Sequence, residues 1–191
     1  MSLVASDRVS MDLLQARLTA YEYIGYEGKC MLFKNVLSPE ECAQWISDSE
    51  AVGYEPALIT SNGKQVLMPS VRQGDRCMID GDTAKLEVLM SRLPLTELGT
   101  INPRLRFLRY NPGDYFMPHH DMRYKRSEWT LHIYLNEAFK GGETTFIEDA
   151  WKVAYTPEAG SVILFHQSLL HEGNIVVEGR KYSVRTEMIT S

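Results

Sequence analysis

Hydrophobic residues in the first hundred positions recur at intervals typical of helices, with one short β-like run among them. The pattern predicts helices over residues 12–21, 38–51 and 83–93, and a strand over residues 30–33. The second helix has a clear start signal. Ser38 is a preferred cap, Pro39 suits the first helical position, and Glu41 stands where it can complete a capping box.

From Leu105 onward the pattern changes to short β-like segments separated by turn residues. Strands are expected over residues 105–110, 115–119, 129–136, 144–147, 151–155, 161–165, 175–177 and 182–188. Many short strands at regular spacing predict two sheets around a cavity, as in a jelly roll, with helices covering one sheet from outside. We therefore expect one integrated, mainly β domain with supporting α-helices. Residues 1–103 form a helical and mixed support region, and residues 104–191 form the core.

Composition and charge narrow the class of protein. The chain has 191 residues, of which 44% are hydrophobic, and this suits a single core. A net charge of −5 disfavours a nucleic-acid partner. No apolar run approaches the roughly 18 residues that cross a bilayer, so no membrane partner is expected. The three cysteines, Cys30, Cys42 and Cys77, form no CxxC pair and favour a reducing compartment. No signal peptide is recognised, so a cytoplasmic location is expected.

Three side chains in the β-rich part have the chemistry of a metal site. On a strand, residues i and i+2 share a face, so His119 and Asp121 should point the same way and His120 outward. His171 follows far enough along the chain for a later strand to return beside the first. Two imidazoles and one carboxylate bind Fe(II) and leave positions open for a cosubstrate and O₂. His166 precedes a turn and is not an expected ligand.

Four blocks in this region together resemble the prolyl 4-hydroxylase-type 2-oxoglutarate/Fe(II)-dependent dioxygenases. The blocks are YNPGDYFMPHHD at 110–121, TLHIYLN at 130–136 with GGET at 141–144, PEAGSVILF at 157–165, and HEGNIVVEGRKY at 171–182. They follow the family order over nearly half of the chain, whereas the first hundred residues match only loosely. The resemblance implies a double-stranded β-helix (jelly roll, cupin-like) with His119, Asp121 and His171 as metal ligands. It also implies Fe(II), 2-oxoglutarate and O₂, with ascorbate as a further candidate cofactor.

The resemblance further implies a basic residue that binds the far carboxylate of 2-oxoglutarate. Lys181 follows His171 at the family spacing and is the preferred anchor. Ser183 and Arg185 share its strand face, so Arg185 is the alternative anchor, an additional one, or a group that binds an acidic substrate. An Arg185 inside the barrel would need a carboxylate partner, which Glu187 could provide.

Three other side chains belong to the expected cavity. Tyr110 and Tyr134 match family positions where a tyrosine can bond the cosubstrate, although plain core packing is an equal alternative. His132 shares the face of Tyr134 and replaces an apolar residue that is usual in the family. A second-shell role and a substrate contact are open, but we expect a buried histidine satisfied by hydrogen bonds.

Two segments are candidates for the mouth of the site. Residues 66–82 contain Arg72, Asp75 and Arg76, and we prefer to interpret them as a solvated polar loop. Residues 122–129 are basic and could attract an acidic peptide or a small acid.

The leading prediction is therefore an active hydroxylase that releases succinate and CO₂. Its substrate would be a protein or peptide side chain, such as peptidyl proline, or a small molecule. Two alternatives remain open: a catalytically silent sensor domain that binds 2-oxoglutarate and metal, and a cupin-type metalloenzyme that does not use 2-oxoglutarate. The intact residues His119, Asp121, His171 and Lys181 argue against a silent domain.

Overall fold

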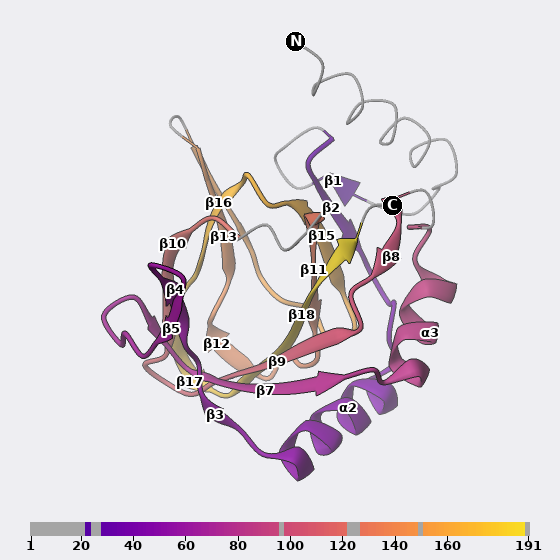
Figure 1. The fold of residues 1–191 in the computed structure, drawn as a ribbon, viewed down its shortest axis with the longest axis horizontal. Helices are drawn as coiled ribbons and strands as arrows, with labels where there is room; N and C mark the ends of the chain where they lie inside the picture. Colours follow the sequence, from indigo (N-terminus) through magenta and orange to yellow (C-terminus); the bar gives the residue numbers. More distant parts are fainter. Residues whose placement is uncertain (1–21, 24–27, 96–97, 122–126, 149–150, 190–191) are drawn as a thin grey trace.

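The computed structural model (Figure 1) describes residues 22–23, 28–95, 98–121, 127–148 and 151–189. It contains two helices, α2 (Pro39–Val52) and α3 (Thr83–Arg92), and many short strands, so the mainly β prediction is confirmed. The helix expected over residues 12–21 lies outside the described residues. Within the described ranges, neither helix is long and apolar enough to cross a membrane.

The larger sheet has nine strands and combines both halves of the chain. Its order is β1-β2-β15-β11-β18-β9-β7-β3, with β8 pairing β18. The bounds are β1 (Glu22–Tyr23), β2 (Cys30–Phe33), β3 (Glu55–Pro56), β7 (Asp75–Asp80), β8 (Thr100–Ile101), β9 (Arg104–Tyr110), β11 (Ser127–Tyr134), β15 (Val162–His166) and β18 (Lys181–Ile189). The strand predicted over residues 30–33 is thus confirmed. Strands from the first 103 residues complete this sheet, and the division of the chain at residue 103 stays a prediction.

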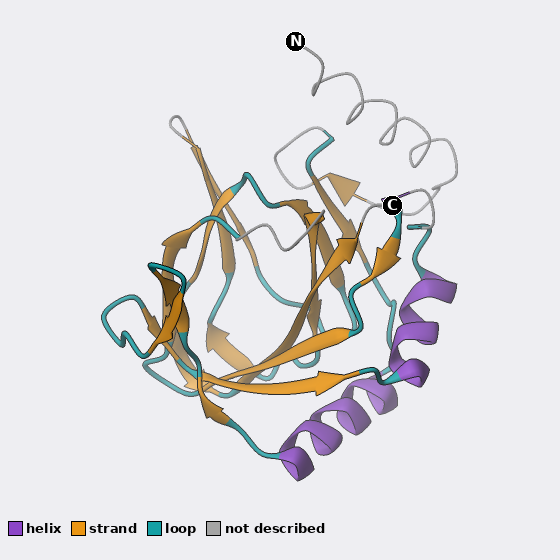
Figure 2. Ribbon diagram, in the orientation of Figure 1, coloured by secondary structure: helices purple, strands orange, loops and turns teal. Residues whose placement is uncertain are grey.

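A smaller sheet of five strands faces the larger one across the barrel interior (Figure 1). Its order is β14-β13-β16-β10-β6, and β12–β17 and β4–β5 form two further two-stranded sheets. The bounds are β4 (Ile59–Ser61), β5 (Lys64–Val66), β6 (Arg72–Gln73), β10 (Tyr115–His119), β12 (Phe139–Gly141), β13 (Thr144–Glu148), β14 (Trp151–Tyr155), β16 (Leu170–Gly173) and β17 (Val176–Gly179). The helices pack on the outer face of the larger sheet only (Figure 2).

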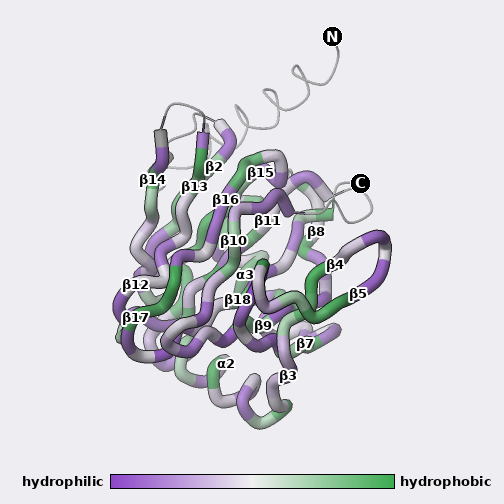
Figure 3. The backbone as a smooth tube through the Cα atoms, turned by 90° about the vertical axis from the view of Figure 1, so that its left-hand side faces the viewer, coloured by the Kyte–Doolittle hydropathy of each residue, from purple (hydrophilic) through white to green (hydrophobic). Residues whose placement is uncertain are grey.

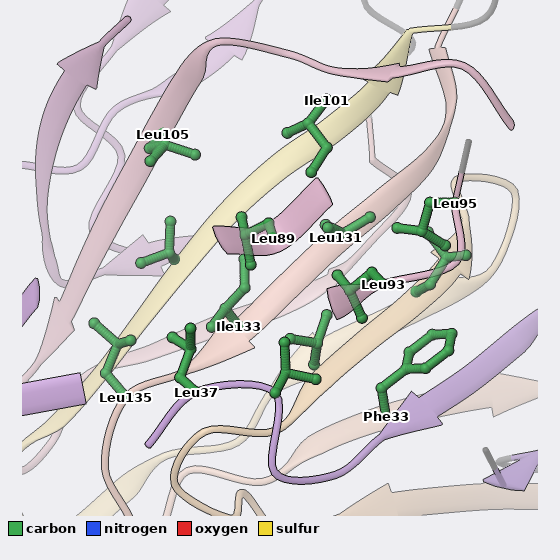
Figure 4. Close-up of a cluster of buried hydrophobic side chains, with 14 of the residues drawn as sticks. Phe33, Leu37, Leu89, Leu93, Leu95, Ile101, Leu105, Leu131, Ile133 and Leu135 are labelled. Carbon is green, nitrogen blue, oxygen red and sulfur yellow. The ribbon is translucent and has the colours of Figure 1, made fainter. Parts of the chain in front are cut away.

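Strand alternation separates the apolar outer face of the larger sheet from its inner face. Leu131 and Ile133 of β11 point outward and form one buried cluster with Leu89 of α3 and with Leu93, which follows the end of α3 (Figure 4). Tyr134 points the other way, into a second buried cluster between the two sheets. The same alternation along β18 turns its odd-numbered polar residues toward the interior. The helices therefore stabilise the sheet from outside and leave its inner face for polar side chains.

The predicted capping box at the start of α2 is present. Glu41 N donates to Ser38 Oγ at 3.2 Å, and Ser38 N donates to Glu41 Oε2 at 2.8 Å. Because Ser38 satisfies a helix N–H group that otherwise has no partner, Ser38→Ala is expected to lower the free energy of unfolding by about 1 kcal/mol. Urea denaturation would measure this. Ser91→Ala, at an exposed position inside α3, is the control, and an equal loss in both variants would contradict the capping role.

The preferred interpretation of residues 66–82 as a solvated loop is wrong for most of that segment. It contains β6 and β7, and β7 pairs along its whole length with β9. Ion pairs account for its charged residues, with Asp75 2.8 Å from Arg109 and Arg76 3.0 Å from Glu55. Cys77 is buried. Asp75 and Arg76 made this segment look like a polar loop, because the oppositely charged residues that pair with them lie in distant parts of the chain.

Candidate metal centre

Strands β10 and β16 bring the three expected metal ligands together. The strands pair in antiparallel fashion with His119 opposite His171, after a register shift that follows Phe116. Asp121 comes two residues after the end of β10. The candidate ligand atoms of His119, Asp121 and His171 all lie within 4.8 Å of one another. Two strand residues and one residue just beyond a strand thus converge on one point.

The orientation of both imidazoles fits a bound metal. His119 Nδ1 lies 2.8 Å from the Met117 carbonyl oxygen, and His171 Nδ1 lies 3.0 Å from that of Leu169. A carbonyl oxygen only accepts hydrogen bonds, so each Nδ1 carries the proton and each Nε2 keeps a free lone pair. Burial lowers the pKa of His119 to about 3 and also lowers that of His171. Both rings are therefore neutral near pH 7, the form that binds a metal.

Asp121 is held by two neighbours. Arg185 contacts both carboxylate oxygens, with Nε 3.1 Å from Oδ2 and Nη2 3.0 Å from Oδ1. Thr130 Oγ1 donates to Oδ2 at 2.6 Å. Burial disfavours the charged form of Asp121, but Arg185 and the two histidines outweigh it and hold the pKa of the carboxyl well below its usual range. The third candidate ligand is thus a fixed carboxylate, and with the two imidazoles it makes a set that suits facial metal binding.

Arg185 is part of a buried network of charges that begins at Asp121. Its Nη1 lies 3.3 Å from Glu187 Oε1, so the expectation that Glu187 would serve as its partner is confirmed. Glu187 also lies 2.8 Å from Arg106 and accepts from Asn102 Nδ2 at 2.9 Å. The charge of Arg185 is therefore paired inside the protein, with the candidate metal ligand Asp121 and with the nearly inaccessible Glu187.

Removing Arg185 should destabilise the metal-free protein. Arg185→Met would leave the buried carboxylates of Asp121 and Glu187 with fewer positive partners, and we expect a loss of about 2–3 kcal/mol in the free energy of unfolding. Chemical denaturation of the metal-free variant would measure it. The control is Arg104→Met, which breaks the exposed pair with Asp80 and should cost far less. Equal losses in the two variants would contradict the network.

Lys181 lies between the sheets in a different electrostatic setting from Arg185. It is 4% exposed, and its Nζ donates to the Gly142 carbonyl at 2.6 Å. The ammonium lies 5.4 Å from the ring centre of Tyr134 and 5.7 Å from that of Tyr110. No carboxylate of the described residues pairs with it, and burial lowers its pKa to about 8. Lys181 is thus a buried cation that lacks an anion.

The interior also contains polar atoms without a partner. His132 Nε2 and Ser183 Oγ are buried, and neither has a hydrogen-bond partner in the described part of the chain. The expectation that His132 is satisfied by hydrogen bonds is therefore wrong for Nε2. Burial, followed by the charge of Lys181, holds the pKa of His132 well below its usual range, so the ring is neutral. Its ring centre lies 4.8 Å from that of Tyr134. Unpaired polar atoms beside Lys181 are typical of a cavity built for a polar ligand.

The remaining candidates fall outside the metal cluster or outside the described residues. His120 is exposed, as expected of an outward side chain. His166 is buried, with Nδ1 2.7 Å from Ser168 Oγ, and it is not part of the cluster. Tyr134 Oη lies 2.6 Å from Thr144 Oγ1, so its hydroxyl already has one partner. The basic segment over residues 122–126 is not among the described residues.

Two residues of the site were missed from the sequence. Thr130 was not singled out, although the strand alternation that turns His132 inward also turns Thr130 inward. Arg72 was assigned to a loop, but it lies on β6 and its Nη2 donates to Tyr110 Oη at 3.3 Å. The useful signal for Arg72 would have been the strand pattern that its charged neighbours hid.

Comparison with known proteins agrees with this geometry. Residues 105–186 match the family model described as the 2OG-Fe(II) oxygenase superfamily. A search of curated proteins gave no match. Among solved structures, a Pseudomonas putida prolyl-4-hydroxylase is similar with a TM-score of 0.68 and 16% identity, covering 95% of this chain and 100% of that chain. A viral collagen prolyl hydroxylase from Paramecium Bursaria Chlorella virus-1, in complex with 2-oxoglutarate, has a TM-score of 0.60 and 21% identity, covering 83% and 94%.

A third similar structure is a Trichoplax adhaerens prolyl hydroxylase in complex with a peptide fragment of the hypoxia inducible factor oxygen degradation domain. Its TM-score is 0.66 at 16% identity, and the alignment covers 98% of this chain and 92% of that chain. At such identities the likeness concerns the fold. The predicted double-stranded β-helix is confirmed.

Proposed function

We propose that this chain, whose residues 105–186 match the 2OG-Fe(II) oxygenase superfamily, hydroxylates its substrate with His119, Asp121 and His171 as the ligands of the iron. When bound, Fe(II) with 2-oxoglutarate and O₂ supplies the oxidation of a C–H bond, with release of succinate and CO₂. The observation that carries the proposal is the pair of Nδ1–H bonds to backbone carbonyls. They leave both Nε2 lone pairs free, and Nε2 of His119 lies 3.8 Å from Asp121 Oδ1.

Aromatic side chains shield the metal side of the cavity. The ring of Phe116 stacks on His119, with centroids 3.5 Å apart and planes 18° apart. Phe165 and Phe146 approach His171, with centroid distances of 4.7 Å and 6.0 Å. These rings hold the imidazoles in place and exclude water, and the exclusion strengthens electrostatic contacts within the site.

Lys181 is the proposed anchor for the far carboxylate of 2-oxoglutarate. Its charge has no carboxylate partner in the described residues, whereas Arg185 is already occupied by Asp121 and Glu187. An incoming carboxylate would relieve the cost of a buried, unpaired ammonium. Ser183 and Tyr134 lie opposite each other on the neighbouring strands β18 and β11, and they would supply hydroxyl groups to the cosubstrate.

The nature of the substrate is the finer part of the proposal. Three similar structures are named prolyl hydroxylases, and one is in complex with a peptide. We therefore propose a peptide side chain, with peptidyl proline as the first candidate, ahead of a small molecule.

The proposal predicts succinate formation that requires added Fe(II), 2-oxoglutarate and O₂ together. The measurement is succinate released per hour by the purified chain, with and without proline-containing peptides, and mass spectrometry of the peptides for an added oxygen. Omitting each component in turn is the control. Fe(II) binding without any 2-oxoglutarate binding would favour a cupin-type metalloenzyme. Binding of neither would favour a non-catalytic domain.

A further inference from the structure

The guanidinium of Arg72 forms no ion pair with any carboxylate of the described residues. It lies on β6, the edge strand of the smaller sheet, opposite Phe116 of β10. Its Nη2 donates to Tyr110 Oη at 3.3 Å, and its Cζ lies 4.7 Å from the ring centre of Phe116. Its Nε is buried and has no hydrogen-bond partner in the described part of the chain. A guanidinium has five N–H donors, so most of this group's capacity is unused.

The lack of an anionic partner distinguishes Arg72 from the other arginines of the described residues. The arginines that form ion pairs with carboxylates are Arg76, Arg92, Arg104, Arg106, Arg109 and Arg185. Arg180 forms none, but it is exposed and donates to Asn111 and Tyr182. Among the arginines that the structure describes, only Arg72 combines partial burial with the lack of an anionic partner. A charge in this position costs free energy unless a ligand pairs with it.

Arg72 is close to the metal ligands. His119 covers one face of the Phe116 ring at 3.5 Å, so the guanidinium must lie over the other face. One aromatic ring therefore separates Arg72 from the metal-binding imidazole. In Figure 1 the two described helices lie across the barrel from β10, β13 and β16, and Figure 3 views the molecule from the side of these strands, so no described helix closes this side.

The position of Arg72 is fixed by its own segment. Gly74, two residues later, has φ of +147°, and a Cβ atom there would lie 2.8 Å from Tyr110 Cδ1. The glycine thus lets the chain pass directly against Tyr110. The two residues after Gly74 form ion pairs, Asp75 with Arg109 and Arg76 with Glu55. Arg72 is therefore held in place before any ligand binds, which lowers the entropy cost of binding.

Two unpaired cations consequently adjoin Tyr110: Lys181 over its ring and Arg72 at its hydroxyl. The far carboxylate of 2-oxoglutarate needs one of them, and Lys181 is the more deeply buried. We propose that Arg72 binds an anionic group, a carboxylate or a phosphate, of the substrate that is oxidised. This inference rests on the proposed function, and it specifies in addition that the substrate carries a negatively charged group. A planar guanidinium fork suits the oxygens of such a group.

The test follows the Nε–H resonance of Arg72 by NMR, with inorganic sulfate as the anion probe. The protein is loaded with Zn(II), which is diamagnetic, and saturated with 2-oxoglutarate so that Lys181 is occupied. Arg72→Lys assigns the resonance. We expect sulfate at low ionic strength to shift it saturably. By calorimetry, Arg72→Met should weaken sulfate binding by at least about tenfold. Arg76→Met, whose arginine is already paired, is the matched control and should leave the affinity unchanged.

Each other outcome has a defined meaning. An Arg72 resonance that sulfate does not move would overturn the inference. A tenfold weaker 2-oxoglutarate affinity in Arg72→Met would also overturn it, since Arg72 would then serve the cosubstrate. If the loaded wild type fails to bind 2-oxoglutarate, the proposed function fails. Sulfate titration of the metal-free protein would then still show whether Arg72 binds anions.

Discussion

Asp121→Ala is expected to abolish succinate formation and to weaken Fe(II) binding by more than about 100-fold. Loss of groups that merely support a metal ligand typically costs 10–100-fold, and Asp121 is itself the candidate carboxylate ligand. It is also the acceptor for Thr130 and Arg185, so the substitution removes the point at which the metal site joins the buried charge network. The measurements are Fe(II) titration under anaerobic conditions and succinate released in air.

His120→Ala is the matched control for that experiment. His120 adjoins the cluster in sequence but is exposed, and it should retain full metal affinity and activity. Circular dichroism of both variants would establish that each is folded. Full succinate formation by a folded Asp121→Ala protein would contradict the assignment of this carboxylate.

Lys181→Met is expected to raise the dissociation constant for 2-oxoglutarate on the order of 100-fold. A charge-assisted contact with a buried ammonium accounts for an effect of that size, and methionine keeps the volume without the charge. Fe(II) binding should stay unchanged, because Lys181 is not among the clustered ligands. Lys140→Met, which breaks an exposed pair with Glu178, is the control. A large loss in Arg185→Met with none in Lys181→Met would reverse the choice of anchor.

The same lysine gives the cosubstrate affinity a defined pH dependence. Burial lowers the pKa of Lys181 to about 8, so the ammonium is present below that pH and is lost as the pH rises through it. Because only the cation pairs with a carboxylate, 2-oxoglutarate affinity should fall above pH 8, by up to about tenfold per pH unit. In Lys181→Met this dependence should disappear.

Much of the fold could be predicted from local pattern. The cap at Ser38 depends only on neighbouring residues, and strand β10 over residues 115–119 has the predicted bounds. Among the strands that the local pattern missed were β7, whose charges are paired with distant residues, and β16, a short stretch from Leu170 to Gly173. In both cases the stabilising partners lie far away in the sequence, where a local pattern has no information.

In the candidate site, too, local features could be predicted from the sequence, whereas contacts between distant segments could not. Alternation along β18 placed Lys181, Arg185 and Glu187 on one face, and their contacts agree with that placement. The contact between Arg185 and Asp121 could not be predicted, because it requires the register of β18 against β11 and the path of the chain after β10. For His132 the strand pattern predicted only the inward direction of the side chain. Whether its Nε2 atom has a hydrogen-bond partner depends on all the elements that surround it, and these cannot be placed from the sequence.

The most direct test is an anaerobic titration of 2-oxoglutarate into the Fe(II)-loaded chain, followed by visible absorption. Chelation of the iron by the 2-keto acid should produce a charge-transfer band that saturates at one 2-oxoglutarate per chain, and Asp121→Ala should show none. A chain that binds Fe(II) but develops no band at any 2-oxoglutarate concentration would contradict the central claim.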